Sequence, residues 1–419
     1  MRFLLLNQFY LPDPAPTGQY LHDLAQVLVE RGHEVKVLCS RQAYDGSRTY
    51  LRSENRDGVE IVRLPASGFG RRGFVGKMTD YASFYGSLLF ALLRERRRPD
   101  LILALTTPPY IGLLGKLAAK HYGCRHANWV MDLYPDVMFA HGMARRNGIL
   151  FRWLQRLTGR QLRGAQAIIA LGPNMAEQVA RYTANASPPT VVTSLALWSD
   201  PALLSWPEPQ AHLLRAERGW SAAESVFLYS GNMGLGHRFG EFLEAAQRLG
   251  AAGPRWVFCG SGKRRPDVET FAKANRTARI ELLDYVPKTQ LRAHLSSADV
   301  HLMSLEPAWQ GLMVPSKLQA SFAVGRPVLY VGGRACETAA WIRDSGGGWV
   351  VPENDLVGLL TAIDQAQDPG ERRRRGDAAR QYAVKHFSAS TNCNHLARLL
   401  ESGVPVVKMT VRNGVPIPV

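Results

Sequence analysis

Short apolar runs alternate with amphipathic stretches along almost the whole chain. In the first half, the runs that predict buried strands are Phe3–Leu6, Glu34–Cys39, Asp100–Leu105 and Gln166–Leu171. Stretches with a helical period lie between them, at Gly18–Gly32 and at roughly Lys77–Arg97. Strands that lack polar alternation and are separated by helices are typical of parallel sheets that are covered on both faces.

The second half repeats this pattern, with a predicted helix at Phe239–Arg248. Its strand-like runs are Ser225–Ser230, Trp256–Cys259, Ile280–Leu283, Val300–Ser304, Pro327–Val331 and Gly348–Val351. We therefore predict an α/β protein made of two doubly wound, Rossmann-like domains.

Proline and small polar residues gather at Thr183–Thr190 and again at Ser205–Gln210, which indicates a linker between two domains. We expect the first domain to span residues 1–190 and the second to span residues 191–370. Residues 403–419 lack a helical period, so we expect a loosely ordered tail or an extension of a sheet edge.

Length and composition exclude several classes of protein. The 419 residues suit two or three domains, and no apolar run reaches the roughly 18 residues of a transmembrane helix. The first residues lack the length and cleavage site of a signal peptide. Five cysteines stand far apart without a CxxC pair, which favours a reducing cytosol over disulfides or a zinc site. Because the DxD, HExxH and HxH motifs and the nucleic-acid module signatures are also absent, we expect neither a metal ion nor a nucleic-acid partner. No GxSxG motif is present, so a hydrolase nucleophile elbow is not indicated.

The formal charge of +16 is unevenly distributed. Residues 1–190 carry 25 Lys and Arg against 14 Asp and Glu, a net of +11, and the remainder carries 26 against 21, a net of +5. A basic half indicates an acidic partner such as an anionic membrane surface or a phosphorylated substrate. The segment Arg71–Arg98 mixes cations with aromatic residues, as a membrane-surface helix does. The alternative is that these aromatic residues belong to the core and that Arg94–Arg98 is a solvated helix end.

Two glycine-rich turns follow predicted strands of the second half. Gly231, Asn232 and Gly234 lie in the first turn, and Gly260, Gly262 and Lys263 lie in or directly after the second. Glycines at such turns let backbone N–H groups approach a phosphate, at the carboxyl edge where open α/β sheets bind ligands. Ordinary tight turns explain the same residues without a ligand.

Lys317 is the best single candidate for a phosphate contact. Pro315 and Ser316 precede it and predict a helix start, with Ser316 as a possible cap. A cation in the first turn of a helix is disfavoured by the helix dipole unless an anion binds there. Glu337, at the start of another predicted helix, is a candidate for binding a sugar hydroxyl, although the dipole alone would also stabilise it.

In the first half, Thr17 and Gly18 join the first strand to the first helix. Their amides could face a sugar or phosphate, or Thr17 could only cap the helix. Asp132 follows an apolar run, and it is a candidate carboxylate at a strand edge above a binding cleft. An ordinary helix cap is the alternative for Asp132.

Several segments match a known family in their order and spacing. They are Tyr10, Pro12 and Pro16–Gly18, Arg31–Val35, Asp132–Asp136, Trp198 and Asp200, Tyr229–Gly234, Pro315–Leu318, Gly325–Pro327 and Gly346–Pro352. Over about residues 1–400 the chain resembles the retaining glycosyltransferases of family 4, whose GT-B fold has two Rossmann-like domains facing across a cleft. It looks most similar to bacterial exopolysaccharide and O-antigen enzymes of the colanic-acid and N-acetylfucosamine transferase type.

This resemblance implies an activity: retaining transfer of a hexosyl or N-acetylhexosaminyl group to a lipid-linked or glycan acceptor in surface polysaccharide biosynthesis. The donor is a nucleotide-sugar, with a UDP-sugar favoured over a GDP-sugar, and no metal ion or other cofactor is implied. The implied location is cytoplasmic, with peripheral contact at the inner face of the plasma membrane.

The resemblance also assigns tasks to residues. The first domain takes the acceptor and the second holds the donor, while helices in residues 371–402 cross back to the first domain. The diphosphate lies against Gly231–Gly234 and Lys317, and the nucleoside lies by Gly260–Lys263. Lys317 and Arg238 stabilise the leaving diphosphate, and Asp132 orients the acceptor or the sugar.

The chain departs from the family pattern at several positions, among them Val314, where many members carry the second of two glutamates eight positions apart, after Glu306. Many members carry Arg and Lys in the loop after the first strand of the second domain, where this chain has Asn232 and His237, with Arg238 adjacent. A ribose-binding carboxylate is common three residues after the lysine, and this chain has Ala320 there. These departures leave two alternatives open: a degenerate GT-B protein that binds partners without turnover, and a sugar-nucleotide epimerase.

Overall fold

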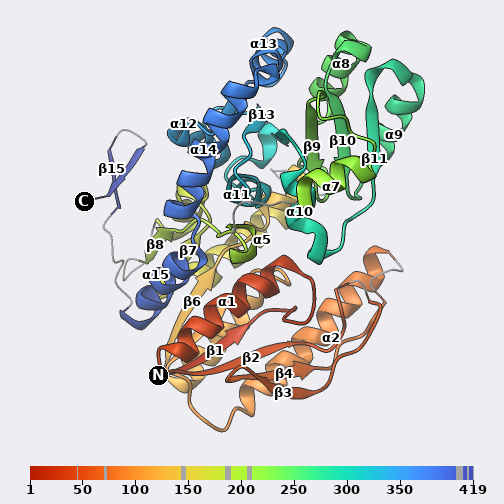
Figure 1. Ribbon diagram of the computed structural model, residues 1–419. Coiled ribbons are helices and arrows are strands. Elements are labelled where there is room, and N and C mark those ends of the chain that lie inside the picture. Colours follow the sequence, from red (N-terminus) through yellow and green to blue (C-terminus); the bar gives the residue numbers. More distant parts are fainter. Residues whose placement is uncertain are drawn as a thin grey trace. The chain divides into compact units, whose positions relative to one another are not determined.

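The computed structural model describes residues 1–44, 46–69, 73–142, 148–184, 190–204, 210–402, 409–412 and 415–418 (Figure 1). Residue contacts divide the chain into a first unit, Met1–Ala196 with the chain from Ser390 onward, and a second unit, Leu197–Ala389. The sequence-based limits were residues 190 and 370. Most of the predicted linker residues, at 185–189 and 205–209, lie outside the described part of the chain.

The first unit contains an eight-stranded sheet in the order β3-β4-β2-β1-β5-β6-β7-β8. Its strands are β1 (Arg2–Leu6), β2 (Glu34–Ser40), β3 (Ser53–Arg56), β4 (Val59–Leu64), β5 (Leu101–Ala104), β6 (Arg125–Trp129), β7 (Ala167–Ala170) and β8 (Val191–Ser194). All neighbouring strands pair in parallel except β3, which runs antiparallel to β4. The apolar run Phe3–Leu6 is fully buried, as a central parallel strand requires.

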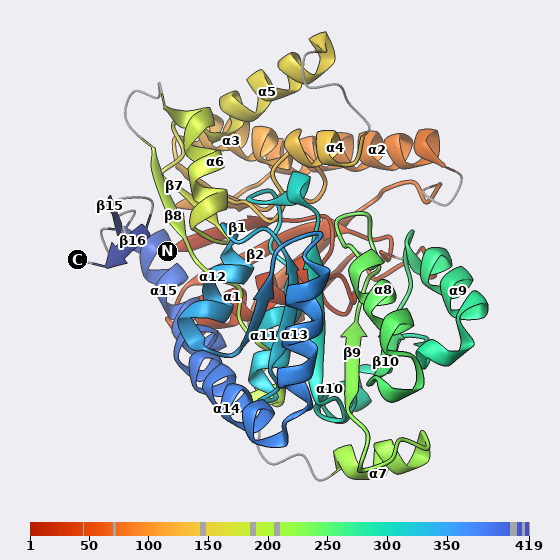
Figure 2. The same cartoon turned by 90° about the horizontal axis from the view of Figure 1, so that it is seen from above.

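Helices cover both faces of this sheet. They are α1 (Pro16–Glu30), α2 (Phe74–Leu93), α3 (Ile111–Tyr122), α4 (Asp136–Ala140), α5 (Ile149–Leu162), α6 (Pro173–Thr183) and α15 (Ala389–Ser402). Figure 2 shows α2, α3 and α5 together along one side of the sheet. Phe84, Leu88 and Leu92 of α2 are buried against this side, at the four-residue spacing of a helix face. The helix ends at Leu93, before the arginine-rich Arg94–Arg98, so that part of the predicted helix is wrong.

The last described helix, α15, packs on the first unit. Glu401 lies 2.6 Å from the Arg31 guanidinium and 2.7 Å from Nε2 of His33. Hydrogen bonds from Arg31 and His33 lower the pKa of Glu401 to about 2, and the bond from Arg31 makes the larger contribution. The preceding helix, α14 (Pro369–His386), belongs to the second unit, so the chain returns to the first unit only after α14.

The described tail residues form two short strands, β15 (Met409–Arg412) and β16 (Val415–Pro418), which pair antiparallel as a sheet of their own. The expected edge extension is therefore wrong for these residues, because they pair with each other rather than with a larger sheet. The rest of the predicted tail, including residues 403–408, lies outside the described residues.

The second unit contains a six-stranded parallel sheet in the order β11-β10-β9-β12-β13-β14. Its strands are β9 (Val226–Ser230), β10 (Arg255–Cys259), β11 (Ile280–Leu283), β12 (Val300–Leu305), β13 (Val328–Gly332) and β14 (Gly348–Val351). They lie within a residue or two of the predicted runs. Both sheets are doubly wound, so the predicted α/β class is confirmed.

Helices pack on both faces of the second sheet. They are α7 (Gln210–Glu217), α8 (Gly240–Leu249), α9 (Arg265–Ala274), α10 (Leu291–Ser296), α11 (Lys317–Ala323), α12 (Glu337–Ser345), α13 (Leu356–Gln367) and α14. Short 3₁₀ turns lie at Pro201–Leu204, Gly250–Ala252, Arg276–Ala278, Lys288–Gln290 and Pro307–Trp309. The main core joins the sheet to apolar residues of α8, α9 and α13, among them Phe242, Val268 and Leu359.

Three further observations concern the described residues only. None of their helices is both long and apolar enough to cross a bilayer. No group of three or more His, Cys, Asp or Glu among them could hold a metal ion. The five cysteines are free thiols.

Candidate active site

The strand order of the second unit changes direction between β9 and β12. From β9 the chain proceeds outward through β10 and β11, and from β12 it proceeds the other way through β13 and β14. Ligands of open α/β sheets bind at such a switch point, beyond the carboxyl ends of the strands. The loops after β9, β10 and β12 and the start of α11 meet at this edge.

The glycines of the first two loops allow the loops to approach one another closely. The N–H of Gly231 donates to the carbonyl of Cys259 at 2.9 Å, and the N–H of Met233 donates to that of Ser261 at 2.8 Å. Gly260 has φ of +125°, and a Cβ there would lie 2.2 Å from the Gly231 oxygen. Loop packing alone therefore requires glycine here, with or without a bound phosphate.

The same close packing surrounds Asn232. A Cβ on Gly262, which has φ of +145°, would lie 2.5 Å from the Met233 oxygen and 2.7 Å from Oδ1 of Asn232. A Cβ on Gly234 would lie 3.2 Å from Nδ2 of Asn232. The Asn232 amide thus lies between these two glycines.

Lys317, the first residue of α11, crosses the first loop. Its Cε lies 2.7 Å from the position of a Cβ on Gly231, whose φ is +130°. The ammonium Nζ lies 3.0 Å from Nε2 of His237 and 5.0 Å from the centre of the Tyr229 ring. Ser316 precedes Lys317 as an exposed residue, and its side chain makes no capping hydrogen bond. The predicted phosphate contact is therefore brought directly to the predicted glycine turn.

His237 holds the ammonium through a neutral ring. Its Nδ1 lies 2.8 Å from the carbonyl oxygen of Ser304, so Nδ1 must carry the proton and Nε2 must accept from Lys317. Burial, and then the charge of Lys317, lowers the pKa of His237 to about 3. The imidazole therefore stays neutral at physiological pH.

Lys317 lacks an opposite charge in the described part of the second unit. No ion pair joins its ammonium to a described carboxylate, and burial lowers its pKa to about 7. An anion beside this ammonium would favour the charged form and raise its pKa again. The local conflict that the sequence indicated for Lys317 is thus present in the structure.

The other cations near this edge are differently placed. Arg238 pairs with Glu241 and, at 3.1 Å, with Glu306, which also accepts from Arg264 at 2.8 Å. Burial acts to lower the pKa of Arg238. Its interactions with Glu241 and Glu306 outweigh burial and raise the pKa, and the hydrogen bond to Glu241 contributes most to this rise. Lys263 is exposed. The positive charge of Arg238 is therefore already balanced, unlike that of Lys317.

Glu337 begins α12 just after β13 and is only 2 % exposed. In the preceding loop, a Cβ on Gly333 would lie 1.8 Å from Nε2 of Gln310, so the loops after β12 and β13 pack tightly. Ala320 is partly buried against an apolar cluster that includes Leu203 and Leu295. These apolar neighbours are a poor environment for the ribose-binding carboxylate that the family resemblance implies at that position.

The predicted residues of the first unit lie at the carboxyl ends of its own strands. Asn7, which follows β1, donates from Nδ2 to Oγ1 of Thr17 at 3.2 Å. A Cβ on Gly18 would lie 2.9 Å from the carbonyl oxygen of Phe9. Close packing of α1 on this loop therefore explains Gly18, and contact of either residue with a ligand stays a prediction.

Asp132 follows β6 and lines a small cavity together with Tyr110, Tyr134 and Gln161. Its N–H donates to Oγ1 of Thr106 at 3.2 Å. Burial raises the pKa of the Asp132 carboxyl to about 6. A carboxyl with a pKa near neutral can both donate and accept a proton or a hydrogen bond at physiological pH.

Sequence reasoning missed two features. The contact between Lys317 and His237 joins positions 80 residues apart, and only the loop fold brings them together. The N-terminal turn of α5 exposes Ile149 (81 %), Leu150 (62 %) and Trp153 (51 %). Apolar residues at the first two positions of a helix, with arginines interleaved, were the available signal for the second feature.

Two protein families match the chain. Residues 17–195 match the glycosyl transferase 4-like domain, and residues 224–368 match the glycosyl transferases group 1 domain. Among curated relatives, a Pseudomonas aeruginosa protein named as a glycosyltransferase, WbjE, is 26 % identical over 287 residues, which cover 68 % of this chain and 70 % of that protein. WcaI of Escherichia coli K12, named as a colanic acid biosynthesis glycosyl transferase, is 23 % identical over 388 residues, 87 % of this chain and 92 % of that protein.

Solved structures show the same fold. WaaG, a glycosyltransferase involved in lipopolysaccharide biosynthesis, aligns with a TM-score of 0.68 and 17 % identity over 96 % of this chain and 100 % of its own. Anabaena HepE in complex with UDP-glucose aligns with a TM-score of 0.69 and 13 % identity over the same shares. The chain therefore combines a glycosyl transferase 4-like domain with a glycosyl transferases group 1 domain, and its two Rossmann-like units are those of the GT-B glycosyltransferase fold.

Proposed function

We propose that this protein transfers a sugar, with retention, from a UDP-sugar to a lipid-linked or glycan acceptor in the biosynthesis of a surface polysaccharide. Support for the pathway comes from the relatives, since WcaI is named for colanic acid biosynthesis and WaaG for lipopolysaccharide biosynthesis. Support for the donor comes from HepE, which was solved in complex with UDP and with UDP-glucose.

The observation that carries the proposal is the setting of Lys317. Its ammonium is held across Gly231 by a neutral His237, at the switch point of the sheet, without a carboxylate partner in the described chain. A donor diphosphate supplies the missing negative charge, and the ammonium in turn stabilises the charge that grows on the diphosphate as the glycosidic bond breaks. Lys317 thereby supplies the positive charge that Asn232 and the neutral His237 do not provide.

The remaining steps follow from positioning. The acceptor hydroxyl attacks the anomeric carbon from the face that the diphosphate leaves, and a diphosphate oxygen takes the hydroxyl proton. We assign the alignment of acceptor or sugar to Asp132, whose raised pKa lets its carboxyl donate or accept a hydrogen bond. Holding both substrates in the reacting geometry accounts for much of the rate in such a reaction.

We further propose that the first unit contacts an anionic membrane. On the helices α2, α3 and α5, the exposed apolar residues are Val75, Met78, Phe90, Leu93, Leu117, Ile149, Leu150 and Trp153. Basic residues interleave with them, including Lys77 on α2 and Arg152 on α5. Apolar side chains with neighbouring cations bind the headgroup region of anionic bilayers. This surface would bring the acceptor unit to lipid-linked saccharides.

The test is a transfer assay with purified protein, a panel of radiolabelled UDP- and GDP-sugars, and a lipid extract as acceptor. We expect one UDP-sugar to yield a glycosylated product whose new linkage keeps the donor's anomeric configuration by NMR. Lys317→Gln should lower this transfer at least about 100-fold, while Lys273→Gln, an exposed lysine of α9, should not change it.

Each other result favours a different function. Release of an epimerised sugar without transfer to any acceptor would identify an epimerase. Binding of UDP without transfer or hydrolysis of any donor would identify a scaffold. A product with inverted configuration would contradict the retaining mechanism but not the transferase.

A further inference from the structure

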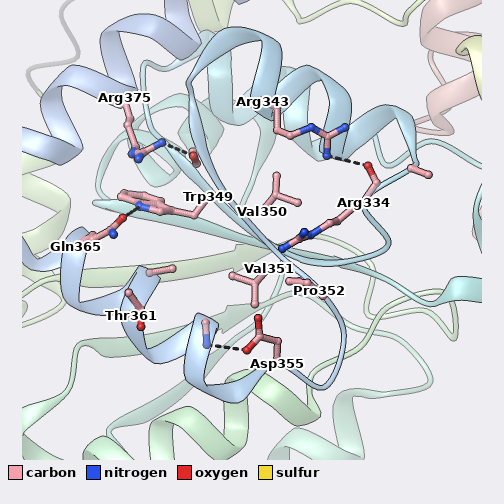
Figure 3. A pocket seen from close by; sticks show the side chains of 14 residues that line it. Arg334, Arg343, Trp349, Val350, Val351, Pro352, Asp355, Thr361, Gln365 and Arg375 are labelled. Carbon is pink, nitrogen blue, oxygen red and sulfur yellow. Dashed lines mark hydrogen bonds between the residues drawn. The ribbon is translucent and has the colours of Figure 1, made fainter. Parts of the chain in front are cut away.

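A hollow of about 890 Å³ lies along the open edge of the second unit's sheet, beside β14 (Figure 3). Its floor is the apolar strand segment Gly348–Pro352, and residues of α13 form one wall. Figure 3 shows Arg375 and the pair Arg334 and Arg343 on opposite sides of Val350. Nothing in the proposed transfer reaction uses this hollow.

One hydrogen-bonding side of the β14 backbone faces away from β13 and toward the hollow. The carbonyl of Gly347 accepts from Val328 of β13, so this residue faces the neighbouring strand. The carbonyl of Gly348 accepts from Arg375 instead, so it faces the hollow. Because backbone groups alternate along a strand, the N–H and C=O of Val350 also face the hollow. No described residue pairs with them there, and such unpaired edge groups are a template for another strand.

The charges around the hollow are predominantly positive. Arg375 pairs with Glu371 at 2.7 Å and lies over the Trp349 ring, 4.6 Å from its centre. Arg343 donates to the carbonyl oxygen of Arg334 at 2.8 Å, and neither guanidinium pairs with a described carboxylate. The carboxylate that lines the hollow, Asp355, accepts from the N–H of Gly358 at the start of α13. Two arginines are therefore available to an anion.

We propose that this groove binds an extended acidic segment of a partner protein, which adds to β14 as a further strand. Its backbone pairs with Val350, its apolar side chains lie on the floor beside Val350 and Pro352, and its carboxylates face Arg334 and Arg343. Strand addition to a sheet edge is an established mode of peptide recognition, in which the backbone gives affinity and the side chains give specificity. The four residues of β14 set the length of the paired segment at about 13 Å.

The observations favour a peptide over the other anionic ligands. A free phosphate would use the arginines but leave the backbone groups of Val350 and the apolar floor uncovered. A lipid surface is broad, whereas the available groups line a groove that is walled on two sides. Only an extended chain offers a donor, an acceptor, apolar groups and carboxylates at strand spacing. This inference does not depend on the proposed transferase activity.

The test uses a fluorescently labelled short peptide of alternating valine and glutamate, titrated with the full-length protein and followed by anisotropy. We expect saturable binding that Arg334→Glu with Arg343→Glu weakens at least about tenfold. Arg373→Glu, an exposed arginine of α14 outside the hollow, is the matched control and should bind like wild type. The same peptide with methylated backbone nitrogens on alternate residues should not bind, because strand pairing needs those N–H groups.

The variant Val350→Pro tests the proposed backbone pairing by changing the protein instead of the peptide. It removes an N–H that faces the hollow, and proline is tolerated on edge strands where the N–H faces outward. We expect peptide binding to be lost at an unchanged melting temperature, and the methylated peptide keeps the test valid if this variant does not fold. Absence of saturable peptide binding, or binding that ignores both the charge reversal and the methylation, would overturn the proposal. Binding of phosphatidylglycerol vesicles that the double reversal abolishes, without peptide binding, would also overturn it in favour of a lipid.

Discussion

Asp132 in the first unit and Lys317 in the second are both ionisable side chains close to the carboxyl ends of parallel strands. Burial moves each pKa toward neutral, upward to about 6 for Asp132 and downward to about 7 for Lys317. Neither makes an ion pair with a described residue. They differ in how the side chain is held: the structure fixes Asp132 through its backbone N–H, whereas His237 binds the Lys317 ammonium itself.

This difference separates two kinds of site. A carboxyl with a raised pKa takes up a proton at little cost in free energy. It can therefore either donate a hydrogen bond to a substrate hydroxyl or accept one from it. A lysine that is held in place beside a neutral acceptor is prepared for an anion, because its charge is favourable only when the anion arrives. We therefore regard the second unit as preorganised for its ligand and the first unit as adaptable, and the following variants test that contrast.

The largest effect is expected for Gly231→Ala. The new Cβ would lie 2.7 Å from Cε of Lys317, and the φ of +130° is strained for alanine by about 1–3 kcal/mol. Lys317 must move, so kcat/KM should fall more than about 100-fold together with a lower melting temperature. Gly240→Ala, at an exposed helix position with open space around its Cβ, should leave both unchanged. Equal activity of the two variants would show that the position of Lys317 is unimportant.

The second largest effect is expected at His237. Leucine there removes the acceptor for Lys317, and kcat/KM should fall about 10- to 100-fold. Glutamine places an oxygen acceptor near the position of Nε2, so His237→Gln should recover most of the loss, whereas His237→Asn should not. If all three variants lose activity equally, His237 has a packing role rather than a positioning one.

A smaller effect on catalysis is expected for Arg238→Gln. Arg238 is already neutralised by Glu241 and Glu306, so kcat/KM should change less than about tenfold. Loss of the half-buried pairs should lower the free energy of unfolding by about 1–2 kcal/mol. A loss of activity as large as that of the Lys317 variants would place Arg238 on the leaving diphosphate, as the family resemblance implied.

The last prediction concerns stability alone and consists of two opposite slopes with pH. Relative to Asp132→Asn, the wild type should lose stability as pH rises from 3.8 to about 6, because the folded state holds the Asp132 proton more tightly. Relative to Lys317→Met, the wild type should gain stability as pH rises from about 7 to 10.5, because the unfolded state holds the Lys317 proton more tightly. Urea unfolding across these ranges gives both slopes, and slopes of the same sign would contradict the comparison.

Much of the fold could be predicted from the sequence because buried parallel strands are continuous apolar runs. The run Val300–Ser304 became β12, and Ile280–Leu283 became β11 without change. The end of α2 could not be predicted, since Arg94–Arg98 consists of good helix formers and the first residue that breaks a helix is Pro99. The pairing of β15 with β16 depends on contacts between short segments that carry no strong pattern.

The candidate site was predictable only where a residue conflicts with its local structure. Lys317 stood out because a cation at a helix start needs a compensating charge. The glycines of the two loops were assigned to phosphate binding, but the close approach of the two loops already explains Gly260 and Gly262. The role of His237 could not be predicted, because it depends on a hydrogen bond from its Nδ1 to the carbonyl oxygen of Ser304, 67 residues away. That bond orients the ring so that Nε2 faces Lys317.

The most direct test of the account is calorimetric titration of UDP into the wild type and into Lys317→Gln at about pH 8, in two buffers of different ionisation enthalpy. We predict that UDP binds the wild type with uptake of a proton. The reason is that the bound anion raises the pKa of the Lys317 ammonium, which is about 7 in the free protein. Lys317→Gln should lose this uptake and bind at least about tenfold more weakly. UDP binding with equal affinity and no proton uptake in either protein would contradict the assignment of Lys317 to the donor diphosphate.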